Sequence, residues 1–186
     1  MNARKVTTAS LLTALALAVY IVEAQIPPLL PLPGIKPGLS NAVTLFALFF
    51  AGPGVAAPVL VARILLGGLL TGQAFSMLYS AAGGFLSFAF GACVYRRFPR
   101  NQVFVVSMIS AVLHNIGQLA ASAATSSAAV FAYLPALVAS GLVTGLFTGL
   151  CAQYALLHIG KIGFFKKNAL TASGSFISQR TEDKNH

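Results

Sequence analysis

The sequence predicts an all-α integral membrane protein, a bundle of six transmembrane helices. Composition is the first observation, because 57% of the 186 residues are hydrophobic and only 8% are charged, against roughly 25% charged residues in soluble proteins. The second is that the apolar residues form runs of membrane-spanning length. The third is that short stretches of glycine, proline or basic residues separate these runs, as expected of turns between spans.

The expected spans, in chain order, lie at residues 7–25, 39–51, 55–71, 74–95, 102–123 and 130–158. The second is short for a crossing and reaches the surfaces with its flanks. Turns are expected at residues 52–54, 72–73 and 125–127, where Gly, Pro, Ser or Thr gather. We expect one membrane domain over residues 1–165. The basic and polar tail over residues 166–186 is expected to be cytoplasmic and disordered.

The basic residues predict the orientation of the bundle. Six spans place both termini on one side, and of the twelve Lys and Arg residues only Lys36 lies opposite and only Arg63 lies within a span, which leaves ten. An excess of basic residues marks the cytoplasmic side. Both termini are therefore expected in the cytoplasm of a bacterial cell, in a multi-pass protein of the cytoplasmic membrane. The ten residues are Arg4, Lys5, Arg96, Arg97, Arg100, Lys161, Lys166, Lys167, Arg180 and Lys184.

The net charge of +9 does not indicate a nucleic-acid partner. The basic residues lie between and beyond the apolar spans, where they set topology and contact anionic lipid headgroups. No basic stripe interleaved with aromatic residues occurs. The partners expected from this pattern are membrane lipid and a small-molecule ligand.

The stretch over residues 26–41, IPPLLPLPGIKPGLSN, is apolar but is not expected to be helical, because five prolines remove backbone donors and disfavour helix at the preceding residues. On the predicted topology it is an outer loop, which we interpret as a lid. Ser40 and Asn41 resemble a helix start at the outer surface. Gly38 to Asn41 would then offer unpaired N–H groups and a positive dipole end to an anion or a carbonyl group, with Lys36 adding charge. For Asn41 itself, simple helix capping is the favoured interpretation, and contact with a ligand is the alternative.

Ionisable and amide side chains inside the membrane are costly and suggest function. Glu23 lies near the outer end of the first span, while Arg63 and His114 lie about mid-depth. Gln118 shares a helix face with His114, one turn further out, and Asn115 lies on another face. These residues predict a substrate-binding pocket in the outer half of the membrane. Two alternatives stay open: a structural pair between Arg63 and Glu23, and an interhelical hydrogen bond made by His114 or Gln118.

Catalysis is poorly supported by the sequence. The chain has three acidic residues, Glu23, Glu182 and Asp183, whereas metal-dependent diphosphate chemistry needs several carboxylates to hold Mg²⁺. No nucleotide-binding motif, nucleophile elbow or Cys/His cluster occurs. We therefore predict no catalytic residue, no metal and no cofactor.

Small residues recur at four-residue intervals in two spans, as Ser10, Ala14 and Ala18 and as Gly141, Gly145 and Gly149. Such rows let helices approach closely in lipid. Packing inside the bundle is one interpretation. The other is that a partner protein docks against the first span.

Four segments together resemble the family named both heptaprenyl diphosphate synthase component I and Gx transporter. They are PGIKPGLSN at residues 33–41, GGLLTG at 67–72, SAAGG at 80–84 and HNIGQ at 114–118, and the match covers about residues 5–160. Pro37 departs from the usual non-proline residue before Gly38. The first name implies a subunit that aids synthesis of the isoprenoid chain of menaquinone.

The second name implies similarity to the S components of energy-coupling-factor transporters. These are six-helix proteins with cytoplasmic termini and an outward pocket under the loop after the first helix. Their first helix carries an Ala-x-x-x-Ala surface, matched here by Ala14 and Ala18, that docks on a transmembrane subunit coupled to two ATPases. The predicted topology, lid and pocket favour a substrate-binding transport component that takes a small amphipathic molecule from the outer side. The alternatives are a non-catalytic component I of the synthase and a passive membrane scaffold.

Overall fold

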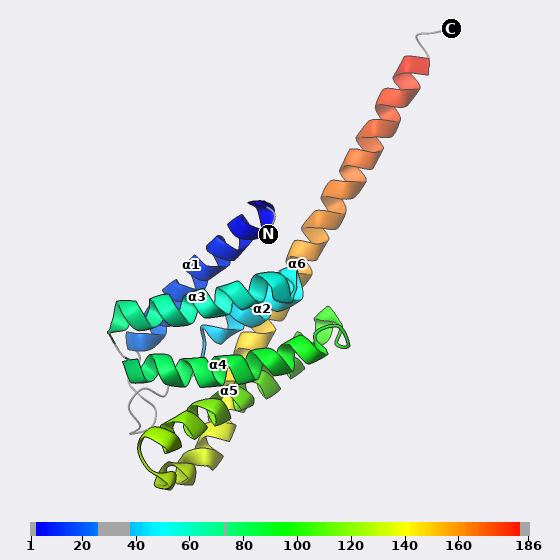
Figure 1. Cartoon of the computed structure of the whole chain (residues 1–186). Coiled ribbons are helices and arrows are strands. Elements are labelled where there is room, and N and C mark those ends of the chain that lie inside the picture. The colour runs from blue at the N-terminus through cyan, green and yellow to red at the C-terminus, as the bar shows by residue number, and fades with distance from the viewer. Residues whose placement is uncertain (1–2, 26–37, 73, 183–186) are drawn as a thin grey trace.

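The computed structural model describes residues 3–25, 38–72 and 74–182, with side chains described up to residue 159. This part of the chain contains helices and turns and no strand, which confirms the all-α prediction (Figure 1). The helices, in order, are α1 (Ala3–Gln25), α2 (Asn41–Ala51), α3 (Pro53–Thr71), α4 (Ala74–Val94), α5 (Val103–Thr125) and α6 (Leu134–Glu182), with the short 3-10 helices η1 (Arg100–Gln102) and η2 (Ala128–Tyr133).

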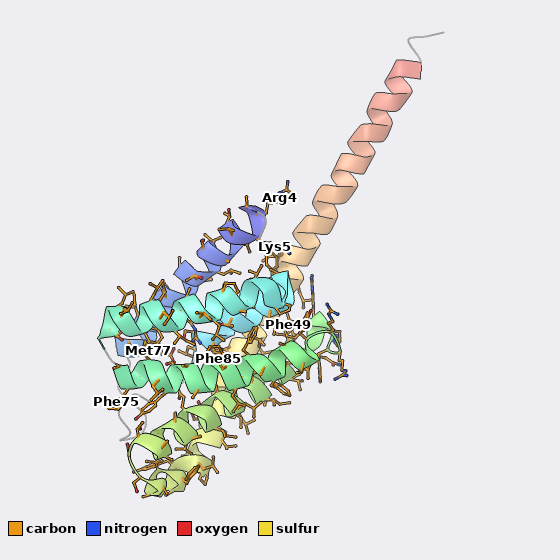
Figure 2. All side chains as sticks on the ribbon, in the orientation of Figure 1. Arg4, Lys5, Phe49, Phe75, Met77 and Phe85 are labelled. Carbon is orange, nitrogen blue, oxygen red and sulfur yellow. The ribbon has the colours of Figure 1, made fainter. Side chains whose placement is uncertain are left out.

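Length and surface character make this a membrane bundle. Within the described residues, five helices are long and apolar enough to cross a membrane, and α2 is a shorter apolar helix of 11 residues. Large apolar side chains cover the outside: Leu69 is 75% exposed, Leu11 72% and Phe75 65%. Phe75 and Phe85 of α4, both labelled in Figure 2, are exposed in the same way. A soluble protein rarely exposes so much continuous apolar surface, so these side chains face lipid.

The helices run back and forth between two ends of the bundle. Figure 1 shows the start of α1, the α2–α3 turn and the α4–α5 connection toward one end, and the α3–α4 turn and the α5–α6 connection toward the other. Arg4 and Lys5 lie at the first end (Figure 2). The basic residues 96–100 belong to the α4–α5 connection, so they share that end. This arrangement agrees with the charge asymmetry that predicts a cytoplasmic face there.

Two predicted turns rest on glycines with positive φ. Gly52 has φ 84° and separates α2 from α3, and Pro53 then occupies the first position of α3, where its missing N–H has no helical partner to lose. Gly72 has φ 64° and ends α3 in the left-handed conformation that glycine adopts without strain. These two residues fix the bounds of α3 close to the predicted ones.

The largest difference from the sequence prediction concerns the tail. Residues 166–186 are expected to be a disordered tail, but α6 continues without interruption to Glu182, and residues 183–186 lie outside the described part. The stretch from 160 to 182 has no proline, and an isolated glycine costs a helix only about 1 kcal/mol. The predicted boundary at residue 165 therefore falls inside a single helix.

The two rows of small residues have different surroundings. A Cβ atom at Gly145 would lie 2.7 Å from the Met108 Cα, and one at Gly149 would lie 2.6 Å from the Ser107 Cβ. The α6 row therefore packs directly on the backbone of α5, which confirms the internal-packing interpretation for this row. The α1 row faces outward, because Ser10, Ala14 and Ala18 are exposed.

Candidate functional site

The polar residues of the bundle interior gather around the start of α2. Helix α1 contributes Glu23, α3 contributes Arg63, and α5 contributes His114 and Gln118. Each of these side chains is at most 2% exposed. Helix α4 closes the group with Gly83 and Gly84, which are also buried. The structure thus brings together most of the residues that the sequence predicted for a pocket.

Glu23 binds the N-terminus of α2. Its Oε1 atom accepts hydrogen bonds from the backbone N–H groups of Gly38 and Leu39, the latter at 3.0 Å, and its Oε2 atom accepts from Ser40 N at 3.2 Å. The first N–H groups of a helix have no partner within the helix and carry a partial positive charge. The anion site predicted at this helix start is therefore occupied by a carboxylate of the chain itself.

Arg63 reaches the same helix start from α3. Its Nη1 atom donates to the Ser40 hydroxyl at 2.5 Å, while the Ser40 backbone N–H donates to Glu23. The two charged groups thus meet at Ser40. Ser40 does not cap α2 with its side chain, because its backbone is already helical and its hydroxyl is bonded to Arg63.

Asn41 differs from its expected role as a cap. It is the first residue of α2, and its Nδ2 atom donates to the Ser87 hydroxyl at 3.0 Å. Ser87 in turn donates to the Gly84 carbonyl at 3.1 Å. The capping expectation is overturned because Glu23 already binds the helix N-terminus, and the amide links α2 to α4 instead.

His114 lies in a space that two glycines leave open. A Cβ atom at Gly38 would lie 2.9 Å from His114 Cδ2, and Gly38 has φ 80°, which other residues rarely adopt. A Cβ atom at Gly83 would lie 2.9 Å from His114 Nδ1 and 3.0 Å from Gln118 Cγ. Any larger residue at either position would displace the imidazole.

Several hydrogen-bonding atoms of the cluster have no partner within the described part of the chain. They are Nε and Nη2 of Arg63, Nδ1 of His114 and both amide atoms of Gln118. A Cβ atom at Gly84 would lie 3.5 Å from Arg63 Nη2, so this donor faces the glycine pair of α4. Among the described residues, Gln118 does not make the interhelical hydrogen bond that was one of its two interpretations. Buried polar atoms without partners are rare and call for an explanation.

The cluster lies deeper than the sequence predicted. Ser40 contacts Arg63, near the middle of α3, and Gly38 contacts His114, near the middle of α5. The sequence instead placed Ser40 and Asn41 at the outer surface. The reason is the length of α2, because 11 residues rise only about 16 Å, roughly half the hydrocarbon thickness.

Three of the predicted residues in the described part of the chain are not part of this cluster. Asn115 donates from Nδ2 to the Leu137 carbonyl at 2.8 Å and so joins α5 to α6. Ala14 and Ala18 lie on the outer face of α1. Lys36, with the rest of the predicted lid over residues 26–37, lies outside the described residues. No group of three or more His, Cys, Asp or Glu side chains suited to a metal occurs in the described part.

Sequence reasoning missed the role of α4. Its buried face is built mainly from small residues, namely Ser76, Ser80, Gly83, Gly84, Ser87 and Gly91. The signal was present in the spacing, because these positions recur every three or four residues, as on one side of a helix. It was harder to recognise than the other two rows because serine and glycine alternate irregularly.

The comparisons with known proteins agree with this architecture. A family model described as heptaprenyl diphosphate synthase component I matches residues 12–156. This range includes every residue of the cluster, from Glu23 to Gln118. No curated protein and no solved structure matches the chain. The chain belongs to the heptaprenyl diphosphate synthase component I family.

Proposed function

We propose that this member of the heptaprenyl diphosphate synthase component I family is a non-catalytic membrane subunit of such a synthase, acting in the synthesis of the menaquinone side chain. The family match over residues 12–156 carries this proposal. The distribution of acids supports it. Only Glu23 falls within residues 1–165, and its carboxylate is bonded to the start of α2. The carboxylates that hold Mg²⁺ against a diphosphate must then come from a partner subunit.

The partner subunit is proposed to act at the end of the bundle that carries Arg96, Arg97 and Arg100. These side chains are exposed in the α4–α5 connection. An exposed basic connection suits an acidic, water-soluble partner as well as lipid headgroups. A membrane subunit in this position would keep a soluble synthase close to the bilayer that receives its long apolar product.

The test is purification of the tagged chain from its native membranes in mild detergent, with the untagged strain as control. We expect a soluble, aspartate-rich prenyl diphosphate synthase to be enriched with the tag, and the Arg96→Ala/Arg97→Ala variant to retain less of it. Deletion of the chain should change the length of the isoprenoid product. No enrichment above the control, together with an unchanged product length, would contradict the proposal.

A second candidate function is a substrate-binding transport component, and the atoms of Arg63 and Gln118 that lack partners favour it. These atoms comprise three N–H-bearing nitrogens and one carbonyl oxygen in the bundle interior. A ligand with oxygen acceptors would satisfy the donors. Under this proposal Arg63, Gln118 and His114 contact the ligand, while Gly38 to Asn41 and Glu23 shape the site. Lys36 stays a predicted contributor.

Charge balance indicates which ligand suits this site. Glu23 already occupies the positive end of α2 and offsets the Arg63 charge. A further anion would therefore add an uncompensated charge to the membrane interior, which is costly. A neutral amphipathic molecule with carbonyl or hydroxyl oxygens avoids this cost, so it is the proposed ligand class.

Mass spectrometry of small molecules that co-purify with the protein tests this second function. The wild type should carry a neutral, oxygen-bearing compound that Arg63→Gln and Gln118→Leu variants lose. Gln153→Leu is the matched control, because Gln153 lies on α6 and accepts from Phe104 N at 3.5 Å, away from the cluster. Equal amounts in all four proteins would contradict ligand binding and favour a passive scaffold.

The transport function would also need a coupling partner. We propose that a transmembrane subunit coupled to ATPases docks on α1, where Ala14 and Ala18 face outward. A groove of about 500 Å³ runs beside this face and includes Ser10 and Ala14 of α1 together with Pro58 and Ala62 of α3. Small exposed residues beside a groove allow a partner helix to approach closely.

A further inference from the structure

A small cavity lies among α2, α4 and α5, about one turn along α2 from the cluster. Its volume is about 10 Å³. Four of its lining side chains are polar, those of Asn41, Thr44, Ser87 and Ser110, and the other three are apolar. All four polar residues are buried. A space of this size is enough for the centre of one water molecule and too small for an organic ligand.

Two hydroxyl groups at this cavity have no hydrogen-bond partner within the described part of the chain. They are Thr44 Oγ1 on α2 and Ser110 Oγ on α5, and both residues are 2% exposed. Ser87 on α4 accepts from Asn41 and donates to the Gly84 carbonyl, which leaves its oxygen one further acceptor site. Helices α2, α4 and α5 therefore each have a hydroxyl group at this cavity that can form a further hydrogen bond.

We infer that this cavity is a binding site for a single structural water molecule. A water there would bond to Thr44, Ser110 and Ser87, and three hydrogen bonds are typical of buried water. Leaving the two hydroxyls unpaired would cost free energy that the water removes. A metal cation fits poorly, because no charged residue lines the cavity to balance it.

The water gives α2 a second polar attachment. Asn41 and Thr44 are three residues apart and so lie on the same face of the helix. The start of α2 is bound by Glu23 and Arg63, and the water would bind its next turn to α4 and α5. This inference concerns residues outside the proposed ligand contacts and does not depend on either proposed function.

Thr44→Val tests the inference, because valine has nearly the same shape and lacks the hydroxyl. If the water is bound, Thr44→Val and Ser110→Ala should each lower the Tm in mild detergent by about 2–4 °C. The double variant should lose less than the sum of the two, because both hydroxyls serve the same water. Thr13→Val is the matched control. Thr13 lies in the groove between α1 and α3, and its substitution should leave the Tm nearly unchanged.

The opposite sign would overturn the inference. In a dry cavity the two hydroxyls are unpaired, so removing either one should raise the Tm. Strictly additive losses in the double variant would also contradict a shared water. An experimental structure of the wild type provides a test that needs no variant. A density peak within hydrogen-bond distance of both Thr44 Oγ1 and Ser110 Oγ supports the site, and an empty cavity excludes it.

Discussion

Helices α5 and α6 meet along three glycines, Gly141, Gly145 and Gly149, whereas α1, α2 and α3 meet around the Glu23 carboxylate and the Arg63 guanidinium. Helix α1 has its own row of small residues at the same spacing, but that row faces outward. Equal spacing in the sequence therefore has two different outcomes. In lipid, a row of small residues permits two helices to approach closely. The other residues of each helix determine whether a helix of the same chain packs against that row.

The difference follows from what else each helix must bury. Helix α1 carries Glu23, which is expensive in the membrane unless it is bonded. The face that carries Ala9, Leu12, Ala16, Tyr20 and Glu23 is therefore the buried one, and the row of small residues lies on another face. Helix α6 has no charge among residues 134–157, so its glycine face is free to define the contact.

Among the substitutions that test this comparison, Glu23→Ala should lower the stability of the protein most. It leaves the buried Arg63 without its counter-charge and removes the acceptor for three N–H groups at the start of α2. Breaking one half of a buried charge pair costs about 3–5 kcal/mol, which thermal unfolding in detergent would measure. The Glu23→Leu/Arg63→Met variant should lose less, because it removes both charges. A loss below about 1 kcal/mol for Glu23→Ala would show that the Glu23 and Arg63 charges contribute little to the association of α1, α2 and α3.

Gly145→Ala tests the other side of the comparison. The new Cβ atom would lie 2.7 Å from the Met108 Cα, and a backbone atom can move away only if the helices separate. We expect a loss of about 1–3 kcal/mol, the usual range for overpacking. Gly54→Ala is the matched control, since nothing lies within 4 Å of its Cβ position, and it should be neutral or slightly stabilising. Equal effects of both changes would argue against close packing of α5 and α6.

Asn115→Leu should have a smaller effect on the α5–α6 side. The change removes the 2.8 Å hydrogen bond to the Leu137 carbonyl. Interhelical hydrogen bonds in membranes contribute about 0.6 kcal/mol on average, so the Tm should fall by a few degrees at most. A loss as large as that of Gly145→Ala would mean that the polar contact, and not the glycine row, determines this interface.

Ala14→Leu should have the smallest effect on stability. Ala14 is exposed on α1, and substitutions at such positions usually change stability by less than about 0.5 kcal/mol. If α1 docks on a membrane partner, the same change should reduce the amount of that partner recovered by affinity purification. Recovery unchanged from wild type would contradict docking at this face.

The sequence predicted the helices well because their causes are local. Long apolar runs, Gly52 with Pro53, and Gly72 fix the bounds of α2 and α3 to within about two residues of those predicted. The end of α6 was missed because nothing in the sequence forces either order or disorder there. Only the basic and polar composition of residues 166–186 favoured a disordered tail.

The contacts of the site were less predictable because they depend on tertiary packing. Glu23, Arg63, His114 and Gln118 were identified as buried polar residues that needed an explanation, and they do converge. That Glu23 would bind the start of α2, and that Asn41 would face Ser87, depends on how deep α2 sits. The length of α2 can be read from the sequence, whereas its depth depends on the contacts that its first residues make with α1 and α3.

The length of α6 determines how far its C-terminal end lies from the membrane. Its 49 residues extend about 74 Å at 1.5 Å per residue, against a hydrocarbon layer of about 30 Å. Its apolar span extends at least to Ile159, and basic residues follow from Lys161 on. Residues 160–182 form an arm of about 35 Å beyond the bundle, which Figure 1 shows leaving at the end where α1 begins. A helix of this kind acts as a semi-rigid spacer. A molecule bound at the tip of this arm would therefore lie about 35 Å from the end of the bundle. That distance is several times the Debye length of ~8 Å at physiological salt.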